Sequence, residues 1–284
     1  MKHVKAFCFQ CRAPVTKLIK RLDLANILEC DVCKIAFIQP TYSGKVKLPY
    51  NFRLYNLNYE KHANRLYPLI RTINSFISKG KLLDIGAGYG LFASLINKRG
   101  ADFDISVIEP TQNPKYIKGL NINNYKTTFE RFKTNIKYDI ITLFDVIEHL
   151  ADPNAQVLKI KKLLNNKAKL VIQTPNYNSL MAKVCKNWSW WMPEDHKFLF
   201  GPMSLSNFLT EKGFKILYIQ TYEDLADFKK NLDGNFINIK NIFLRRLSKY
   251  LFYVPFFIFY SVLRPFLWKL GLGGLIFLIA ENNE

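Results

Sequence analysis

The sequence has few acidic residues, few cysteines and no long apolar run. It holds 22 Asp and Glu against 41 Lys and Arg, a formal net charge of +19. The longest charge-free apolar stretch, residues 250–263, has 14 residues and contains Pro255, whereas a membrane-spanning helix needs roughly 20. The N-terminal stretch MKHVKAFCFQC has no apolar segment of the kind found in signal peptides. These absences predict a cytoplasmic protein without a leader or a spanning helix.

Five cysteines, four of them in two CxxC pairs, do not fit a secreted disulfide framework. Cys8 pairs with Cys11 and Cys30 with Cys33, and the 18 residues between the pairs match the spacing of a zinc ribbon. Four thiolates on two tight turns would form a closed tetrahedral site, so we predict a structural zinc ion. Redox-active or metal-free thiols are the alternative. We expect the remaining Cys185 to be a small buried residue.

The excess of positive charge is uneven along the chain. Residues 1–80 contain 14 Lys and Arg and 4 Asp and Glu, and residues 240–269 contain six basic residues and no acid. This imbalance favours an anionic partner, which could be nucleic acid, anionic lipid or a phosphorylated substrate. The alternative is that the lysines only solvate the surface.

From residue 81 onward, short apolar runs alternate with longer amphipathic segments, which is typical of a mostly parallel α/β sheet. We expect seven strands, at residues 81–86, 104–110, 124–128, 138–145, 168–175, 214–222 and 275–281. Helices are expected at 91–100, ending at Gly100, and at 153–165. The chain therefore divides into a ribbon-like segment (1–40), a helical lead-in (41–80) and a doubly wound α/β domain (81–284).

A glycine-rich loop, DIGAGYG at residues 84–90, follows the first strand and opens a helix. Glycines allow the backbone to approach a ligand closely, and the helix N-terminus offers free N–H groups. Glu109 ends the next strand, 23 residues after Gly86, where an acid can accept hydrogen bonds from a ribose diol. A plain tight turn between strand and helix is the alternative.

The loop favours S-adenosylmethionine over a dinucleotide. Dinucleotide folds carry GxGxxG, with the pyrophosphate on the helix N-terminus, whereas this loop reads GxGxG. Asp84 stands two residues before the first glycine, and its carboxylate would repel a pyrophosphate but attract an ammonium group. S-adenosylmethionine carries both an ammonium and a sulfonium group, so we predict it as the cofactor.

Together, the motifs resemble those of class I S-adenosylmethionine-dependent methyltransferases. LLDIGAGYG (82–90) is similar to the first motif of that family, and VIEP (107–110) to its second-strand acid. The branch with the ubiquinone-pathway O-methyltransferases has segments similar to FDVIEHLADP (144–153), QTPNYNSL (173–180) and HKFLFGPMSLSNFLTEKGFKI (196–216). The CxxC segment resembles a small ribbon that precedes many members, although Arg12 and Lys34 replace the usual glycines.

The resemblance implies a set of cofactor-binding residues: Asp84, Gly86, Ala87, Gly88, Glu109, Phe129, Phe144 and Asp145. The loop residues among them, from Asp84 to Gly88, would line the methionine moiety, and Glu109 would bind the ribose hydroxyls. Phe129, with its neighbours at 128 and 130, would flank the adenine. Phe144 and Asp145 would lie beside the sulfonium and the acceptor. The resemblance also implies that the last strand runs antiparallel, between the fifth and sixth strands.

Asp145, Glu148 and His149 follow the fourth strand, where catalytic groups of open α/β sheets gather. Methyl transfer to a hydroxyl needs only a base for the acceptor proton, and the His149 imidazole could serve. The three residues could instead hold a divalent cation, or Glu148 and His149 could simply cap the helix. His196 is a further catalytic candidate beside an acceptor pocket with three tryptophans, of which we expect at least two in the core: Trp188, Trp190 and Trp191.

Residues 240–269 lie between the sixth and seventh strands, which must pair in one sheet, so a single membrane span there is unfavourable. A dense apolar segment flanked by basic residues suits a pair of interfacial helices on anionic lipid. The alternative is a helical cap over the acceptor cleft or a dimer contact.

These features predict S-adenosylmethionine-dependent methyl transfer to a hydroxyl of a small molecule, a lipid-linked intermediate or a surface glycan. The enzyme would be cytoplasmic or peripheral on the inner face of the membrane. The alternatives are an RNA-modifying methyltransferase, which the basic charge suggests, and a non-catalytic scaffold. Nucleic acid is the less favoured partner because the fourth strand ends in FDVIEH and not in (D/N)PP(Y/F).

Overall fold

The computed structural model describes residues 6–41, 59–99, 102–110, 115–185, 188–223, 228–229, 231–232, 236 and 239–283. The chain forms two compact units. The first contains residues 1–44, 174–206 and 219–276, and the second contains residues 45–173, 207–218 and 277–284. Residues 42–58 of the expected lead-in, and Gly100, lie outside the described residues.

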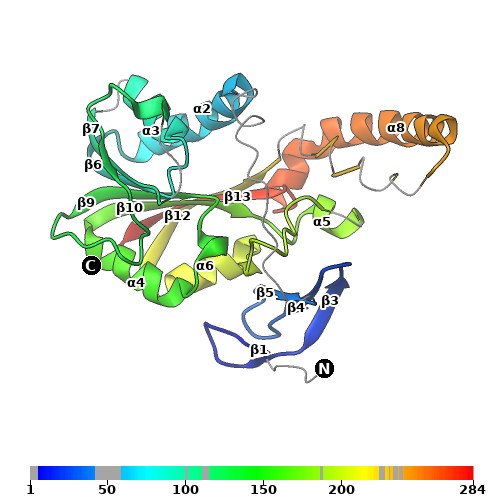
Figure 1. Ribbon diagram of the computed structural model, residues 1–284, viewed down its shortest axis with the longest axis horizontal. Helices are drawn as coiled ribbons and strands as arrows, with labels where there is room; N and C mark the ends of the chain where they lie inside the picture. Colours follow the sequence, from blue (N-terminus) through cyan, green and yellow to red (C-terminus); the bar gives the residue numbers. More distant parts are fainter. Residues whose placement is uncertain are drawn as a thin grey trace. The chain divides into compact units, whose positions relative to one another are not determined.

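A seven-stranded sheet has the order β12-β13-β10-β9-β6-β7-β8 (Figure 1). Its strands are β6 (Lys79–Ile85), β7 (Asp102–Ile108), β8 (Asn123–Tyr125), β9 (Tyr138–Phe144), β10 (Leu164–Pro175), β12 (Phe214–Tyr222) and β13 (Leu275–Asn282). The β6–β7, β6–β9, β7–β8 and β9–β10 pairs are parallel. The last strand, β13, is antiparallel and lies between β10 and β12. The predicted doubly wound fold is therefore confirmed.

The central strands are apolar on both faces. Neighbouring residues such as Leu82 and Leu83 of β6, or Ile140 and Ile141 of β9, are all fully buried, as expected where helices cover both sides of a parallel sheet. Helices α2 (Tyr59–Phe76) and α3 (Leu91–Lys98) lie on one side, and α4 (Pro153–Leu163) lies on the other (Figure 1). Asp152 caps α4 by accepting a hydrogen bond from the Ala155 amide at 3.0 Å.

The N-terminal segment forms short antiparallel strands. Strands β1 (Ala6–Phe7) and β2 (Pro14–Val15) pair with each other, and a second sheet has the order β11-β5-β4-β3. Its strands are β3 (Lys17–Arg21), β4 (Ala25–Glu29), β5 (Ala36–Pro40) and β11 (Phe198–Leu199). Around the cysteines, Cys8, Val15 and Cys30 form a small buried apolar cluster.

The second half of the N-terminal segment shares a larger core with distant parts of the first unit. Ala25, Ile27 and Ile38 pack in one cluster with α5 (Leu180–Val184), two tryptophans and residues near α8. Trp188 and Trp191 are 2% and 4% exposed, so two of the three tryptophans lie in the core as expected. Shorter elements are the helix α6 (Pro202–Thr210) and the 3-10 helices η1 (Lys115–Ile117) and η2 (Ile147–His149).

The basic apolar tail is a single helix, α8 (Ile242–Lys269), with Pro255 and Pro265 inside it. The expectation of two helices is therefore wrong, because neither proline breaks the helix. By length and composition, its 28 residues are long and apolar enough to cross a membrane. This corrects the expectation from the 14-residue charge-free stretch, since the helix continues through the flanking arginines.

Candidate active site

The glycine-rich loop between β6 and α3 combines tight packing with open space. Gly86 has φ 72° and Gly88 has φ 55°, conformations that favour glycine. A Cβ at Gly86 would lie 2.5 Å from Val146 Cγ2, so this position needs glycine for packing. A Cβ at Gly88 would meet nothing within 4 Å among the described residues. The backbone of Gly88 is therefore accessible to a ligand.

Two acidic side chains lie against this loop. Glu109, which follows β7, accepts a hydrogen bond from the Gly88 amide at 2.9 Å. Asp84, the second-last residue of strand β6, accepts a hydrogen bond from the Thr142 hydroxyl at 2.6 Å. Asp84 and Glu109 are only 2% and 6% exposed. The loop thus brings two buried carboxyl groups and one accessible backbone segment together.

Asp84 is poised to bind a cation. Burial is the main cause that raises the pKa of its carboxyl to about 7, with a smaller contribution from the negative charge of Glu109, while the hydrogen bond from Thr142 opposes the shift. A buried carboxylate with an acid nearby is stabilised by a positive charge. An ammonium group at this position would supply that charge, whereas a pyrophosphate would increase the repulsion. The donor set therefore fits S-adenosylmethionine.

The end of β9 holds Asp145 in a strained and well-supported position. Its φ is 56°, a left-handed conformation that costs a non-glycine residue about 1 kcal/mol or more. Gln173 Nε2 donates to Asp145 Oδ1 at 2.9 Å, and the Asp145 amide donates to the Gln173 carbonyl at 3.0 Å. Arg65 of α2 lies 3.8 Å from Asp145 Oδ2. Sequence reasoning missed Gln173 and Arg65, because only the β9–β10 register and the placement of α2 bring them to Asp145.

The aromatic candidates differ in accessibility. Phe144 is half-buried, with its ring centroid 4.5 Å from that of Phe92. Phe129 is 4% exposed, and the Lys159 ammonium lies 4.6 Å from its ring centroid. Lys159 also donates to the carbonyls of Phe129 and Phe132, at 2.5 and 2.7 Å. Lys159 therefore fixes the loop expected beside the adenine, a role that no motif indicated.

Glu148 and His149 lie together on η2. Glu148 is fully buried and His149 half-buried, and their potential ligand atoms lie within 4.8 Å of each other. Among the described residues, Asp145 does not join them in a metal-ligand cluster. The alternative of a cation site made of all three residues is not favoured by this geometry, because Gln173 and Arg65 engage the Asp145 carboxylate.

His196 belongs to the first unit. It is 4% exposed, and its Nδ1–H donates to the Trp190 carbonyl at 2.9 Å. That hydrogen bond sets the ring orientation and places the second nitrogen, Nε2, on the opposite edge of the imidazole.

The four paired cysteines meet in the N-terminal segment of the first unit. The sulfur atoms of Cys8, Cys11, Cys30 and Cys33 all lie within 4.8 Å of one another. The Cys33 amide donates to Cys30 Sγ at 3.4 Å. Burial raises the pKa of Cys8 to about 11, so its thiolate form is unfavourable without a positive charge nearby. A cation held between the four sulfur atoms would supply that charge. The donor set fits a tetrahedral metal site with no open position.

Both cysteine turns adopt the left-handed conformation despite their lack of glycine. Arg12 has φ 62° and Lys34 has φ 52°, and their amides donate to the carbonyls of Cys8 and Cys30 at 2.9 Å. The departure from the usual glycines thus leaves the turn geometry intact. It carries a conformational cost of about 1–2 kcal/mol for each residue.

Replacing Arg12 with glycine should therefore stabilise this segment. Relief of the left-handed strain exceeds the extra entropy that glycine has in the unfolded chain, so we expect a gain of about 0.5–1 kcal/mol. Chemical denaturation would measure the free energy of unfolding. Arg21→Gly, at the end of β3, is the matched control and should destabilise the segment, because its backbone is not left-handed. A destabilised Arg12→Gly variant would contradict the expectation.

Comparisons with known proteins come from sequence and from structure. Residues 59–219 match the model of a family described as a methyltransferase domain. A ubiquinone biosynthesis O-methyltransferase of Rickettsia canadensis is 29% identical over 170 residues, which cover 54% of this chain and 71% of the relative. Its counterpart in Rickettsia conorii is 23% identical over 218 residues, covering 71% and 69%.

Two solved structures share the fold. A SAM-dependent methyltransferase from Archaeoglobus fulgidus has a TM-score of 0.53 at 22% identity, with 82% of this chain and 99% of that chain covered. The 1,6-didemethyltoxoflavin-N1-methyltransferase of Burkholderia thailandensis, with bound S-adenosylhomocysteine, has a TM-score of 0.52 at 10% identity. That match covers 95% of this chain and 100% of the other.

Proposed function

Because this chain belongs to the methyltransferase-domain family and is an S-adenosylmethionine-dependent methyltransferase, we propose that it methylates a hydroxyl group of a small, lipid-borne acceptor. The observation that carries the cofactor part of the proposal is the buried Asp84 beside the accessible Gly88 backbone. The O-methyltransferases of the two Rickettsia species support oxygen as the methylated atom.

In this proposal, the loop residues bind the cofactor. Asp84 accepts hydrogen bonds from its ammonium group, and Gly88 allows its methionine chain to pass close to the backbone. Glu109 accepts from the ribose hydroxyls, since a carboxylate can accept several hydrogen bonds besides the one from Gly88. Phe129 and Lys159 support the loop at the adenine. When bound, S-adenosylmethionine supplies an electrophilic methyl group.

The residues after β9 act on the acceptor. Gln173 and Arg65 hold the Asp145 carboxylate, which orients the acceptor hydroxyl. His149 takes the hydroxyl proton as general base, and the nearby carboxylate of Glu148 stabilises the imidazolium that results. Incubation of the enzyme with a methyl-labelled cofactor and a small-molecule extract, followed by mass spectrometry, tests the proposal. A product labelled on nitrogen or carbon would contradict it.

We further propose that the four cysteines hold a structural zinc ion. The support is their mutual distance and the small apolar core around them, which is too small to fold this segment alone.

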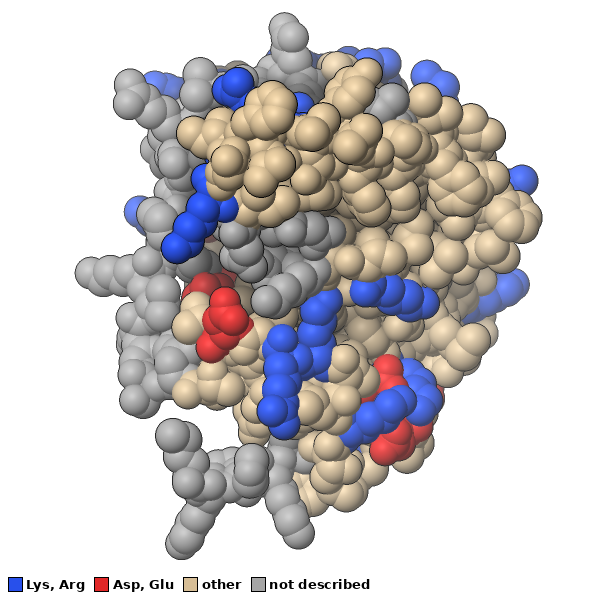
Figure 2. All heavy atoms as spheres, turned by 90° about the vertical axis from the view of Figure 1, so that its right-hand side faces the viewer, with Lys and Arg blue, Asp and Glu red and all other residues tan. Residues whose placement is uncertain are grey.

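The membrane part of the proposal rests on α8. Only 6% of its most apolar 18-residue window is buried. The large apolar side chains exposed on it include Phe243, Tyr250, Leu251, Phe252, Ile258, Phe259, Val262 and Phe266. Exposed apolar surface of this size calls for a partner. Among the coloured residues on the face shown in Figure 2, basic side chains are scattered and acidic ones are few.

The buried side of α8 attaches the helix to the first unit. Tyr260 is 1% exposed, donates to Glu223 at 2.8 Å and stacks on Phe228 with a centroid distance of 4.1 Å. Basic residues without acids suit the headgroups of anionic lipids. In this proposal α8 lies in the interface at the cytoplasmic face, and the acceptor is taken from the lipid.

We expect the protein to float with liposomes that contain anionic lipid, and to float poorly with neutral ones. Because each basic residue contributes about 1 kcal/mol at an anionic surface, Arg245→Glu combined with Arg246→Glu should reduce the bound fraction about tenfold or more. Lys98→Glu with Lys118→Glu, two exposed lysines of the second unit, is the control with the same charge change. Absence of flotation with both lipids would instead assign the apolar face to a protein contact.

A further inference from the structure

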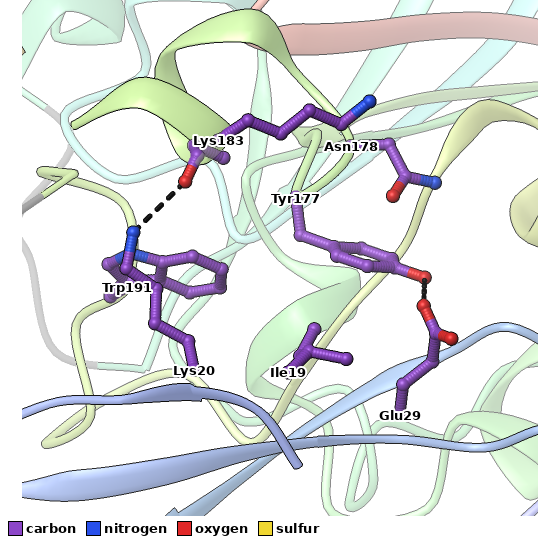
Figure 3. A pocket seen from close by; sticks show the side chains of 8 residues that line it. Ile19, Lys20, Glu29, Tyr177, Asn178, Lys183 and Trp191 are labelled. Atoms are coloured by element: carbon purple, nitrogen blue, oxygen red, sulfur yellow. Dashed lines mark hydrogen bonds between the residues drawn. The ribbon is translucent and has the colours of Figure 1, made fainter. Parts of the chain in front are cut away.

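A cavity lies within the first unit, where β3 and β4 meet the segment that contains α5. Its volume is about 410 Å³. Figure 3 shows the rings of Tyr177 and Trp191 on opposite sides of the cavity, with Ile19 below them. The polar ends of Asn178 and Lys183 lie above. None of these residues lies in the candidate active site.

The two rings are held in the core, and only a small part of each reaches the cavity. Tyr177 and Trp191 are each 4% exposed. The single hydrogen of the Tyr177 hydroxyl is shared between Glu29 Oε2 and the Lys34 carbonyl, both 2.9 Å from the hydroxyl oxygen. Flat aromatic faces fixed in this way bind flat apolar faces of ligands at a low entropic cost.

Two ammonium groups reach the cavity. Lys20 donates to the carbonyls of Ala182 and Cys185, at 3.1 and 2.7 Å, and its ammonium lies 5.3 Å from the Trp191 ring centroid. Two of its three N–H donors are therefore used, and one remains for a ligand. The side chain of Lys183 is exposed. Two ammonium groups at one cavity favour a ligand with an anionic group.

One carboxylate faces the same space. Glu29 accepts from Lys17 at 2.7 Å and from Tyr177. Although burial opposes it, these hydrogen bonds hold the pKa of Glu29 below its ordinary value. Its remaining lone pairs can accept from ligand hydroxyls. Lys17 neutralises most of its charge, so the lysines dominate the potential of the cavity.

We propose that this cavity binds an acidic sugar, a pyranose ring that carries one carboxylate or phosphate group. An apolar patch of the sugar ring would lie against the exposed parts of Tyr177 and Trp191. Its hydroxyls would donate to Glu29 and interact with Asn178, and its anionic group would meet Lys20 and Lys183. A cationic ligand would meet two ammonium groups, and an alkyl chain would leave the polar walls unpaired. The binding does not depend on methyl transfer or on its acceptor.

Calorimetric titration of the full chain, without S-adenosylmethionine, tests the proposal with a matched set of probes. D-glucuronate and D-glucose 1-phosphate combine the ring, the hydroxyls and the charge. D-glucose lacks the charge, inorganic phosphate lacks the ring, and benzoate lacks the hydroxyls. We expect at least one acidic sugar to bind about tenfold more tightly than each of these three. Equal binding of phosphate or benzoate, or no binding of either acidic sugar, would overturn the proposal.

Variants locate the binding. Lys183→Ala should remove most of the preference for an acidic sugar over glucose, and it leaves the core intact because Lys183 is exposed. Lys197→Ala, an exposed lysine of the same unit outside the cavity, is the control and should bind like the original protein. Glu29→Gln should weaken the binding of neutral and acidic sugars alike. If Lys183→Ala and Lys197→Ala bind equally well, the site lies elsewhere and the proposal fails.

Discussion

Asp84→Asn is expected to weaken the binding of S-adenosylhomocysteine by about 10- to 100-fold. A hydrogen bond between a buried carboxylate and an ammonium group contributes about 1.5–3 kcal/mol, which asparagine cannot supply because it carries no charge. Its Oδ1 can still accept from the Thr142 hydroxyl, so the local packing is preserved. Calorimetric titration of both proteins measures the effect.

The same variant separates binding from folding. Because the folded protein holds the pKa of Asp84 near 7, above its unfolded value, ionisation of Asp84 costs stability as pH rises from about 4 to 7. At pH 8, Asp84→Asn removes that cost, so the ligand-free variant should be at least as stable as the original protein. Asp104→Asn, an exposed acid at the start of β7, is the control and should bind normally. Undiminished binding by Asp84→Asn would refute the role of this carboxylate.

Binding should also depend on pH. With a pKa of about 7, Asp84 is mostly protonated at pH 6 and mostly ionised at pH 8. The ammonium group binds the ionised form, so affinity for S-adenosylhomocysteine should rise about tenfold between these two values, with release of a proton. Asp84→Asn should abolish this dependence. A pH profile that is the same in both proteins would mean that another group titrates.

Removal of zinc is expected to unfold the N-terminal segment. Structural zinc sites contribute about 10–16 kcal/mol in zinc-finger peptides, and the cysteines here have only a small apolar cluster around them. We expect about one zinc ion per chain by elemental analysis. Cys30→Ser should lose it, and limited proteolysis should then cut within residues 6–41.

Cys185→Ala is the matched control for the cysteine variant. Cys185 is buried, with its sulfur 3.9 Å from that of Met181, and lies outside the cysteine cluster. This variant should keep its zinc and its resistance to protease. A full zinc content in Cys30→Ser, or none in the original protein purified under reducing conditions, would remove the basis for a structural zinc site.

Most of the fold could be predicted because strands and turns depend on local patterns. Apolar runs of the right length defined all seven strands of the large sheet, although the third is reduced to Asn123–Tyr125. The spacing of the CxxC pairs predicted that the four cysteines meet, and their sulfur atoms lie within 4.8 Å of one another. The helix pair expected at residues 240–269 failed because a proline lowers helix propensity but does not end every helix, and local signals cannot weigh that loss against the rest of the helix.

The sequence by itself determined the positions of the strands along the chain, the glycine-rich loop with Asp84 and Glu109, and the cysteine spacing. Each depends on residues close in the chain. Only the tertiary structure decided that Gln173 and Arg65 hold Asp145, that Lys159 fixes the loop at Phe129, and that β3 and β4 share a core with Trp191. These contacts join residues far apart in sequence, and their partners are chosen by register and packing, which leave no periodic or spaced signal in the chain.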